Sequence, residues 1–204
     1  MALTYTTLLA QVVDTLGSQV TTAQAAALLP MVEARFNRTI NSPQREVTSS
    51  STPTADITLP ADCWQVRDVW LVGSPDVTLE QMSPDEARFH YGTATGSPVA
   101  YVISGTTLDL FPTPTAISTD VVKIRYQQTI PALSEATATN WLLTQHPDIY
   151  LYSLLLQAEA WIVNDERLGI WKTALDEALA ELTNLSNRQR YGASPLVRKA
   201  QSYA

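Results

Sequence analysis

The chain has 204 residues, of which 45% are hydrophobic and only 16% are charged, and its formal net charge is −7. This length supports one domain, or one domain with a sizeable insertion. The negative charge argues against a general nucleic-acid-binding protein, and no window approaches the ~18 apolar residues that a membrane-spanning helix needs. The first residues carry no basic group and no apolar core, so we expect no signal peptide and synthesis in the cytosol.

Charge is distributed unevenly along the chain. Up to Glu181 there are 9 basic and 20 acidic residues, a net charge of −11, whereas the remaining residues carry four basic groups and no acid, so that −11 and +4 give the total of −7. Such asymmetry indicates that the C-terminal segment meets a different partner from the rest of the chain.

The first 40 residues predict two helices. Apolar residues between Tyr5 and Leu16 recur at steps of three and four, and Gly17 can end this helix. Thr22 can cap a second helix that extends to Ile40. Pro30 lies inside this second pattern. Because proline lacks an amide hydrogen and clashes with the preceding turn, we expect a kink there, or a break before a new helix that starts near Pro30.

The sequence pattern in the middle of the chain is typical of β-strands. Short runs of β-branched residues are separated by proline and glycine. A short helix is expected from Pro84 to His90, with Ser83 as its capping residue. A tight hairpin is expected around Gly105. The predicted strands are Glu46–Ser50, Asp56–Leu59, Gln65–Leu71, Ala100–Ser104, Thr107–Phe111 and Val121–Gln127.

Helical patterns return after Asn140. The segment Asp148–Val163 is apolar almost all round, which predicts a helix buried in its own domain or against another subunit. The last helix has a heptad-like seam typical of helical bundles, formed by Leu168, Trp171, Leu175, Ala178, Leu182 and Leu185.

These elements predict an α+β fold. A helical bundle is expected from residues 1–44 and 135–190, with a β-rich insertion at 45–134 and an extended C-terminal tail at 191–204. Gly192 and Pro195 support this tail because both interrupt helices.

No motif for catalysis, cofactor binding or metal binding is present. The seven glycines never fall at phosphate-binding spacing, and Cys63, the single cysteine, can neither form an internal disulfide nor nucleate a metal cluster. A small hydrolase that uses Asp148, Asp165 and Glu166 is a third hypothesis, but adjacent acids on a helix do not converge. Acids in the first turn of a helix explain Asp165 and Glu166 more simply. We therefore expect no enzyme activity, no cofactor and no metal.

Several stretches together resemble the head-to-tail adaptor proteins of tailed bacteriophages, especially of the short-tailed type. The resemblance extends from about residue 20 to 185 and depends on the order of individually weak motifs. These motifs are Leu59–Asp62, Ser97–Ile103, Phe111–Pro114, Ile130–Ser134, Thr139–Leu143, Pro147–Tyr152 and Asn164–Arg167.

The resemblance implies a structural virion protein at the head–tail junction, synthesised in the host cytoplasm. Copies of the chain, commonly about twelve, would form a ring that binds the portal protein and other tail or nozzle proteins. DNA would pass through the ring channel without sequence-specific binding, and no membrane would be involved. The expected portal-binding tail comprises Arg188, Arg190, Tyr191, Pro195, Leu196, Val197, Arg198 and Lys199.

Four aromatic residues are candidates for the contact between subunits, because aromatic side chains are enriched at protein interfaces. They are Trp141, Tyr150, Tyr152 and Trp171. A tail-tube or tail-completion ring is the alternative function, since low charge and a helical seam fit it equally well.

Overall fold

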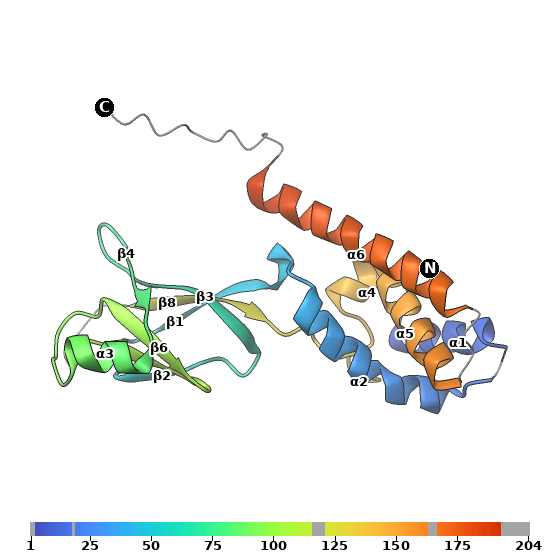
Figure 1. Ribbon diagram of the computed structural model, residues 1–204, viewed down its shortest axis with the longest axis horizontal. Helices are drawn as coiled ribbons and strands as arrows, with labels where there is room; N and C mark the ends of the chain where they lie inside the picture. The colour runs from blue at the N-terminus through green and yellow to red at the C-terminus, as the bar shows by residue number, and fades with distance from the viewer. Residues whose placement is uncertain (1–2, 18, 116–120, 163–166, 193–204) are drawn as a thin grey trace. The chain divides into compact units, whose positions relative to one another are not determined.

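The computed structural model describes residues 3–17, 19–115, 121–162 and 167–192. The chain forms two compact units, a helical unit up to Gln44 and from Ile130 onward, and a sheet unit from Arg45 to Thr129 (Figure 1). Apart from one short helix within the sheet unit, helices and strands occur in separate parts of the chain, so the fold is of the α+β class, as the sequence predicts.

The helical unit is built from segments at both ends of the chain. The bounds of its helices are α1 Tyr5–Thr15, α2 Thr22–Thr39, α4 Trp141–Gln145, α5 Pro147–Ile162 and α6 Leu168–Tyr191. Helix α5 packs against α1, α2, α4 and α6. A helix with neighbours on so many sides cannot keep a broad polar face, which explains the nearly continuous apolar sequence of α5.

Side-chain caps fix where the first two helices begin. Thr4 caps α1 through a reciprocal exchange of hydrogen bonds with Thr7, and Thr21 caps α2 in the same way with Gln24. Such capping boxes satisfy amide groups that the first turn of a helix leaves without partners. Thr21, and not the predicted Thr22, is therefore the capping residue of α2.

Pro30 does not break α2. The helix is continuous from Thr22 to Thr39, and Pro30 is exposed while its neighbour Leu29 is buried. The break that we considered is not observed, because burial of Leu28, Leu29 and Val32 offsets the loss of one backbone hydrogen bond.

One hydrophobic core holds the helical unit together. Each buried leucine side chain contributes about 1.5–3 kcal/mol through the apolar surface that it removes from water. The fully or almost fully buried residues come from all five helices and include Leu8, Leu29, Phe36, Leu142, Leu154 and Leu175.

The connection that returns from the sheet unit is also part of this core. Ile130 and Leu133 are buried among the helices. The backbone amide of Ile130 donates to Asn37 Oδ1 (2.8 Å), and that of Leu133 donates to Glu33 Oε1 (2.7 Å). The helical unit therefore resumes at Ile130, whereas we expected the bundle to resume at residue 135.

The sheet unit contains two four-stranded sheets and a short helix. One sheet has the strand order β1-β8-β3-β4 and the other β2-β7-β6-β5. Helix α3 spans Pro84–Tyr91, and a short 3-10 helix, Pro43–Arg45, precedes the first strand. The strand bounds are β1 Glu46–Ser51, β2 Asp56–Thr58, β3 Cys63–Leu71, β4 Val77–Thr78, β5 Glu80–Gln81, β6 Ala100–Ser104, β7 Thr107–Phe111 and β8 Val122–Gln128.

The chain enters and leaves the sheet unit through two paired strands. Strands β1 and β8 are antiparallel, with Glu46 opposite Gln127 and Ser51 opposite Val122 (Figure 1). At this point the buried Arg45 donates from Nε to the carbonyl of Gln128 (2.9 Å). Because its two ends are neighbours, the unit can be inserted between helices without a long connection.

Both sheets contribute to one core. Leu108 and Leu110 of β7 pack in the same cluster as Ile124 of β8 and Val69 of β3. Buried residues alternate with half-buried ones along β7, and with less buried ones from Val122 to Tyr126 of β8, which is the period-two pattern that predicted these strands. The very short strands β4 and β5 were not predicted, because two residues carry no detectable period.

Candidate interaction surfaces

The end of α6 carries the first part of the predicted portal-binding tail. Arg188, Arg190 and Tyr191 lie in the last turns of this helix, which ends at Tyr191, and Gly192 follows with a φ of 67°. Arg188 and Arg190 lie in the part of the chain expected to be helical, up to residue 190, whereas Tyr191 was expected to belong to the extended tail. Gly192 accounts for the end of the helix, because a positive φ is favourable for glycine and strained for other residues.

Two of these side chains have contacts within the helical unit. Arg190 donates from Nη2 to Asn41 Oδ1 (2.6 Å), and Arg188 lines a groove with His146, Asp148 and Glu181. Basic side chains in the last turn of a helix are also favoured by the helix dipole. The groove has a volume of about 310 Å³, and Tyr191 is exposed. The remaining predicted tail residues, Pro195, Leu196, Val197, Arg198 and Lys199, lie outside the described residues.

The four predicted interface aromatics have different environments. Trp171 of α6 stacks on Tyr152 of α5 with 6.1 Å between ring centroids, and both are half-buried. Trp141 is half-buried at the start of α4. Tyr150 is completely buried in the core of its own unit. Tyr152, Trp171 and Trp141 therefore keep part of their surface exposed, and Tyr150 does not.

Tyr150 belongs instead to a buried polar network. Its hydroxyl accepts a hydrogen bond from Asn140 Nδ2 (2.7 Å) and contacts the carboxylate of Glu33. Asn140 Nδ2 also donates to the carbonyl of Pro131 (2.8 Å), and its Oδ1 caps α4 by accepting from Leu143. These hydrogen bonds hold the segment that returns from the sheet unit against α2 and α5. Each polar group would be costly to bury without these partners.

Burial in this network changes two pKa values. Desolvation raises the pKa of Glu33 above its ordinary value of 4.5, although the hydrogen bonds from Leu133 and Tyr150 act in the opposite direction. Desolvation likewise raises the pKa of Tyr150, and the nearby carboxylate of Glu33 adds to this rise. Tyr150 thus remains a neutral hydrogen-bonding group at every physiological pH.

Two further candidate residues escaped the sequence prediction. Glu159 is completely buried in α5, and Phe89 of α3 is 86% exposed. An acid in the interior of a largely apolar helix, far from the first turn where Asp148 lies, was the available signal for Glu159. Phe89 lies in a short helix that is rich in charged residues. No sequence pattern there indicated whether its side chain is buried or exposed.

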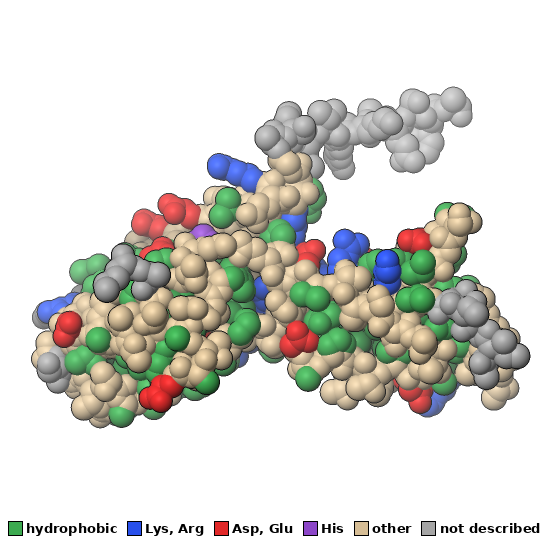
Figure 2. Space-filling view, turned by 180° about the vertical axis from the view of Figure 1, so that it is seen from behind, with side chains coloured by type: hydrophobic (Ala, Val, Ile, Leu, Met, Phe, Trp, Pro, Cys, Tyr) green, Lys and Arg blue, Asp and Glu red, His purple; other side chains and the backbone are tan. Residues whose placement is uncertain are grey.

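The surface of the described residues is poor in charged groups. In Figure 2, neutral polar side chains and backbone cover much of the viewed face, and acidic and basic side chains are scattered among them. Two ion pairs are found in the described part of the chain, Arg125–Asp68 at 2.9 Å and Arg167–Glu159 at 4.0 Å. This surface matches the 16% charged residues of the sequence.

Nothing in the described ranges forms a recognisable reaction centre. His90 is exposed on α3, His146 ends α4 directly before Pro147, and Cys63 is half-buried. No group of three or more His, Cys, Asp or Glu side chains in these ranges could hold a metal ion. None of the helices described is long and apolar enough to cross a membrane. Asp165 and Glu166, considered above for catalysis or a helix start, lie outside the described residues.

Comparison with known proteins gives a match to a protein family. A family model described as SU10 adaptor protein matches residues 3–199, which include the described parts of both units. No individual curated protein matches the chain significantly.

Proposed function

Because this chain belongs to the SU10 adaptor protein family, a family of bacteriophage structural proteins, we propose that its copies form a ring that connects the capsid portal to the tail. The observation that carries the proposal is the length of the family match, from residue 3 to residue 199. The protein is an adaptor of the virion; the ring, its docking to the portal and its channel are the proposed steps.

The C-terminal segment is the proposed contact with the portal. It begins with Arg188 and Tyr191 at the exposed end of α6 and continues through Pro195, Leu196, Val197, Arg198 and Lys199. Its net charge of +4 after Glu181 contrasts with −11 for the residues before it. A positive segment on a negative body favours a partner whose contact surface is acidic.

The body of the protein suits the wall of a DNA channel. With a net charge of −11 up to Glu181, it repels phosphate groups, whereas a basic wall would bind them and slow the passage of DNA. We propose a closed ring of about twelve copies, since closed rings are a common way to assemble identical subunits. Tyr152, Trp171 and Trp141 are the aromatic candidates for contacts between neighbours.

A truncation tests the portal contact. We expect deletion of residues 193–204 to abolish cosedimentation with purified portal protein, while circular dichroism and ring mass remain those of the full chain. The double substitution Arg198→Gln and Lys199→Gln should weaken docking, and Arg88→Gln on the exposed side of α3 is the control. A truncated chain that docks with unchanged affinity contradicts the assignment of the tail.

The alternative is a tail-tube or tail-completion ring. Both functions place copies of the chain in a virion ring, so the mass of the purified particle does not distinguish them. Reconstruction of the virion does, because density for the chain directly beneath the portal supports the adaptor ring and density farther along the tail supports the alternative.

A further inference from the structure

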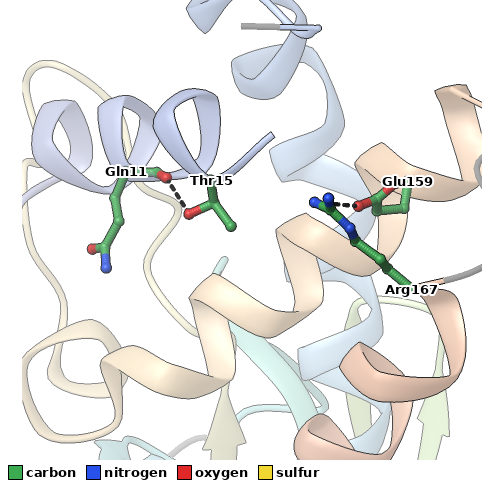
Figure 3. A network of polar contacts seen from close by, with 4 residues as sticks. All are labelled: Gln11, Thr15, Glu159 and Arg167. Atoms are coloured by element: carbon green, nitrogen blue, oxygen red, sulfur yellow. Dashed lines mark hydrogen bonds and ion pairs between the residues drawn. The ribbon is translucent and has the colours of Figure 1, made fainter. Parts of the chain in front are cut away.

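Glu159 is a completely buried acid whose carboxylate has no hydrogen-bond partner in the described part of the chain. Its side chain is 1% exposed, and neither Oε1 nor Oε2 has a donor within hydrogen-bonding distance. The nearest cation is Arg167, whose Nη1 lies 4.0 Å from Oε1 and whose side chain is 54% exposed (Figure 3). This separation is too long for a hydrogen bond, so the ion pair leaves the carboxylate incompletely compensated.

A cavity of about 210 Å³ opens beside this carboxylate. It is lined by the end of α1, the turn after it, the end of α5 and the residue before α6; the polar side chains among these are Asp14, Thr15, Gln19, Glu159 and Arg167. The Thr15 hydroxyl donates to the carbonyl of Gln11 (2.7 Å, Figure 3). Its oxygen therefore keeps lone pairs that can accept a hydrogen bond from a ligand.

The charges around the cavity do not balance. Among the described residues that line it, Asp14 and Glu159 are acidic and Arg167 is basic, which leaves a formal charge of −1. Water can fill such a space and donate hydrogen bonds, but it cannot supply the missing charge. A buried carboxylate is stabilised best by a positive group that also donates hydrogen bonds.

We propose that the Glu159 cavity receives one cationic side chain, a lysine or an arginine, from a neighbouring copy of this chain. A metal ion fits less well, because the cavity offers two carboxylates and one guanidinium, and the described residues contain no group of three metal-ligating side chains. This inference rests on the proposed ring for the identity of the donor, whereas the cation site itself does not.

A second copy can supply the cation. Arg38, Lys172 and Arg188 of the helical unit are exposed, and the ion pairs found among the described residues involve none of them. Each copy thus presents both an incompletely compensated buried acid and exposed cations. Complementary charges of this kind fix the orientation of two identical subunits.

Binding of a small probe tests the cation site without assembly. We expect n-propylguanidinium, a monovalent mimic of the arginine side chain, to bind the full chain saturably in isothermal titration calorimetry at low salt. Glu159→Gln should weaken this binding roughly tenfold or more, whereas Glu177→Gln on the exposed side of α6 should not change it. The neutral isostere n-propylurea should not bind.

Arg167→Gln separates a binding site from a purely structural ion pair. Removal of the resident cation leaves the two acids uncompensated, so we expect n-propylguanidinium to bind this variant several-fold more tightly. Absence of saturable binding to the wild type and to Arg167→Gln overturns the proposal, even if Glu159→Gln fails to fold. Equal binding to the wild type and to Glu159→Gln overturns it as well.

Assembly tests the donor. Glu159→Gln should raise the concentration at which rings form, as measured by sedimentation velocity, and millimolar n-propylguanidinium should do the same for the wild type but n-propylurea should not. If the probe binds through Glu159 while ring formation is unchanged, a neighbouring copy is not the donor and that part of the proposal is wrong. If the wild-type chain forms no ring under any condition, the proposed function fails, but the probe result still decides the cation site.

Discussion

At the scale of single residues, the helical unit buries two carboxylates in contrasting ways. Glu33 receives a hydrogen bond from the Leu133 amide and contacts the Tyr150 hydroxyl, whereas the oxygens of Glu159 have no donor among the described residues. Burial of a charged group is costly unless donors compensate it. Glu33 therefore holds the returning segment through its hydrogen bonds, although its charge is desolvated, whereas the carboxylate of Glu159 accepts no hydrogen bond among the described residues.

The raised pKa of Glu33 predicts a pH-dependent stability. In the folded protein the pKa lies above the ordinary value of 4.5, so the folded state binds more protons than the unfolded state in the interval between these two pKa values. The charge of Glu33 therefore costs stability above the folded pKa, and this cost disappears below about pH 4.5. We therefore compare the free energy of unfolding of Glu33→Gln with that of the wild type at two pH values. The difference, variant minus wild type, should be more positive at about pH 7 than at about pH 4, which means that the variant gains stability relative to wild type as the pH rises.

Urea denaturation at the two pH values measures this difference. Glu177→Gln is the control, because this exposed acid of α6 should show no comparable change. A Glu33→Gln variant that loses more stability at neutral pH than at acidic pH would mean that the hydrogen bonds of the charged carboxylate outweigh its desolvation.

At the scale of secondary-structure elements, α2 shows packing prevailing over local preference. Proline in a helix interior costs roughly 3 kcal/mol relative to alanine, yet α2 runs through Pro30 without interruption. Leu28, Leu29 and Val32 are all buried next to it. Burial of these residues returns several kcal/mol, which exceeds the cost of one proline.

Pro30→Ala should therefore stabilise the protein. Alanine can donate its amide to the carbonyl of Ala26, and Pro30 is exposed, so its ring contributes little to the core. We expect the free energy of unfolding to rise by about 1–3 kcal/mol in urea denaturation. Met31→Ala, at the exposed neighbouring position, should change it by less than about 0.5 kcal/mol. A loss of stability in Pro30→Ala would show that the core requires a proline-specific bend in α2.

At the scale of the whole molecule, two separate cores hold the two units. The helical core and the sheet core share no residue, and the chain passes between the units at Gln44–Arg45 and at Thr129–Ile130. The paired strands β1 and β8 place the two ends of the sheet unit side by side. Two such cores can respond separately to substitution.

A matched pair of cavity-forming substitutions tests this independence. Leu154→Ala in α5 and Ile124→Ala in β8 each remove a side chain that is at most 1% exposed, and each should cost about 2–5 kcal/mol. We expect hydrogen exchange to accelerate in the helical unit for Leu154→Ala and in the sheet unit for Ile124→Ala. Acceleration throughout the chain in both variants would show that the units unfold as one.

The spacing of apolar residues and the positions of proline and glycine predicted most of the helices and strands from sequence alone. The hairpin strands Ala100–Ser104 and Thr107–Phe111 were predicted with their observed bounds, and α5 and the order of helices and strands followed from their apolar patterns. These signals are local, since each depends on residues a few positions apart. The family resemblance, which the family match confirms, added the adaptor function that no single motif carried.

Only the tertiary structure decided which side chains face the core, the surface or a cavity. The sequence placed Tyr150 among the interface candidates and passed over Glu159, and it included Arg188, Arg190 and Tyr191 in a portal-binding tail whose first residues form the last turn of α6. Each of these outcomes depends on neighbours that are distant in sequence, such as Asn140 and Glu33 for Tyr150 or Asn41 for Arg190. A pattern along one helix records that a position is apolar or charged, but the partner that makes its burial favourable comes from another element.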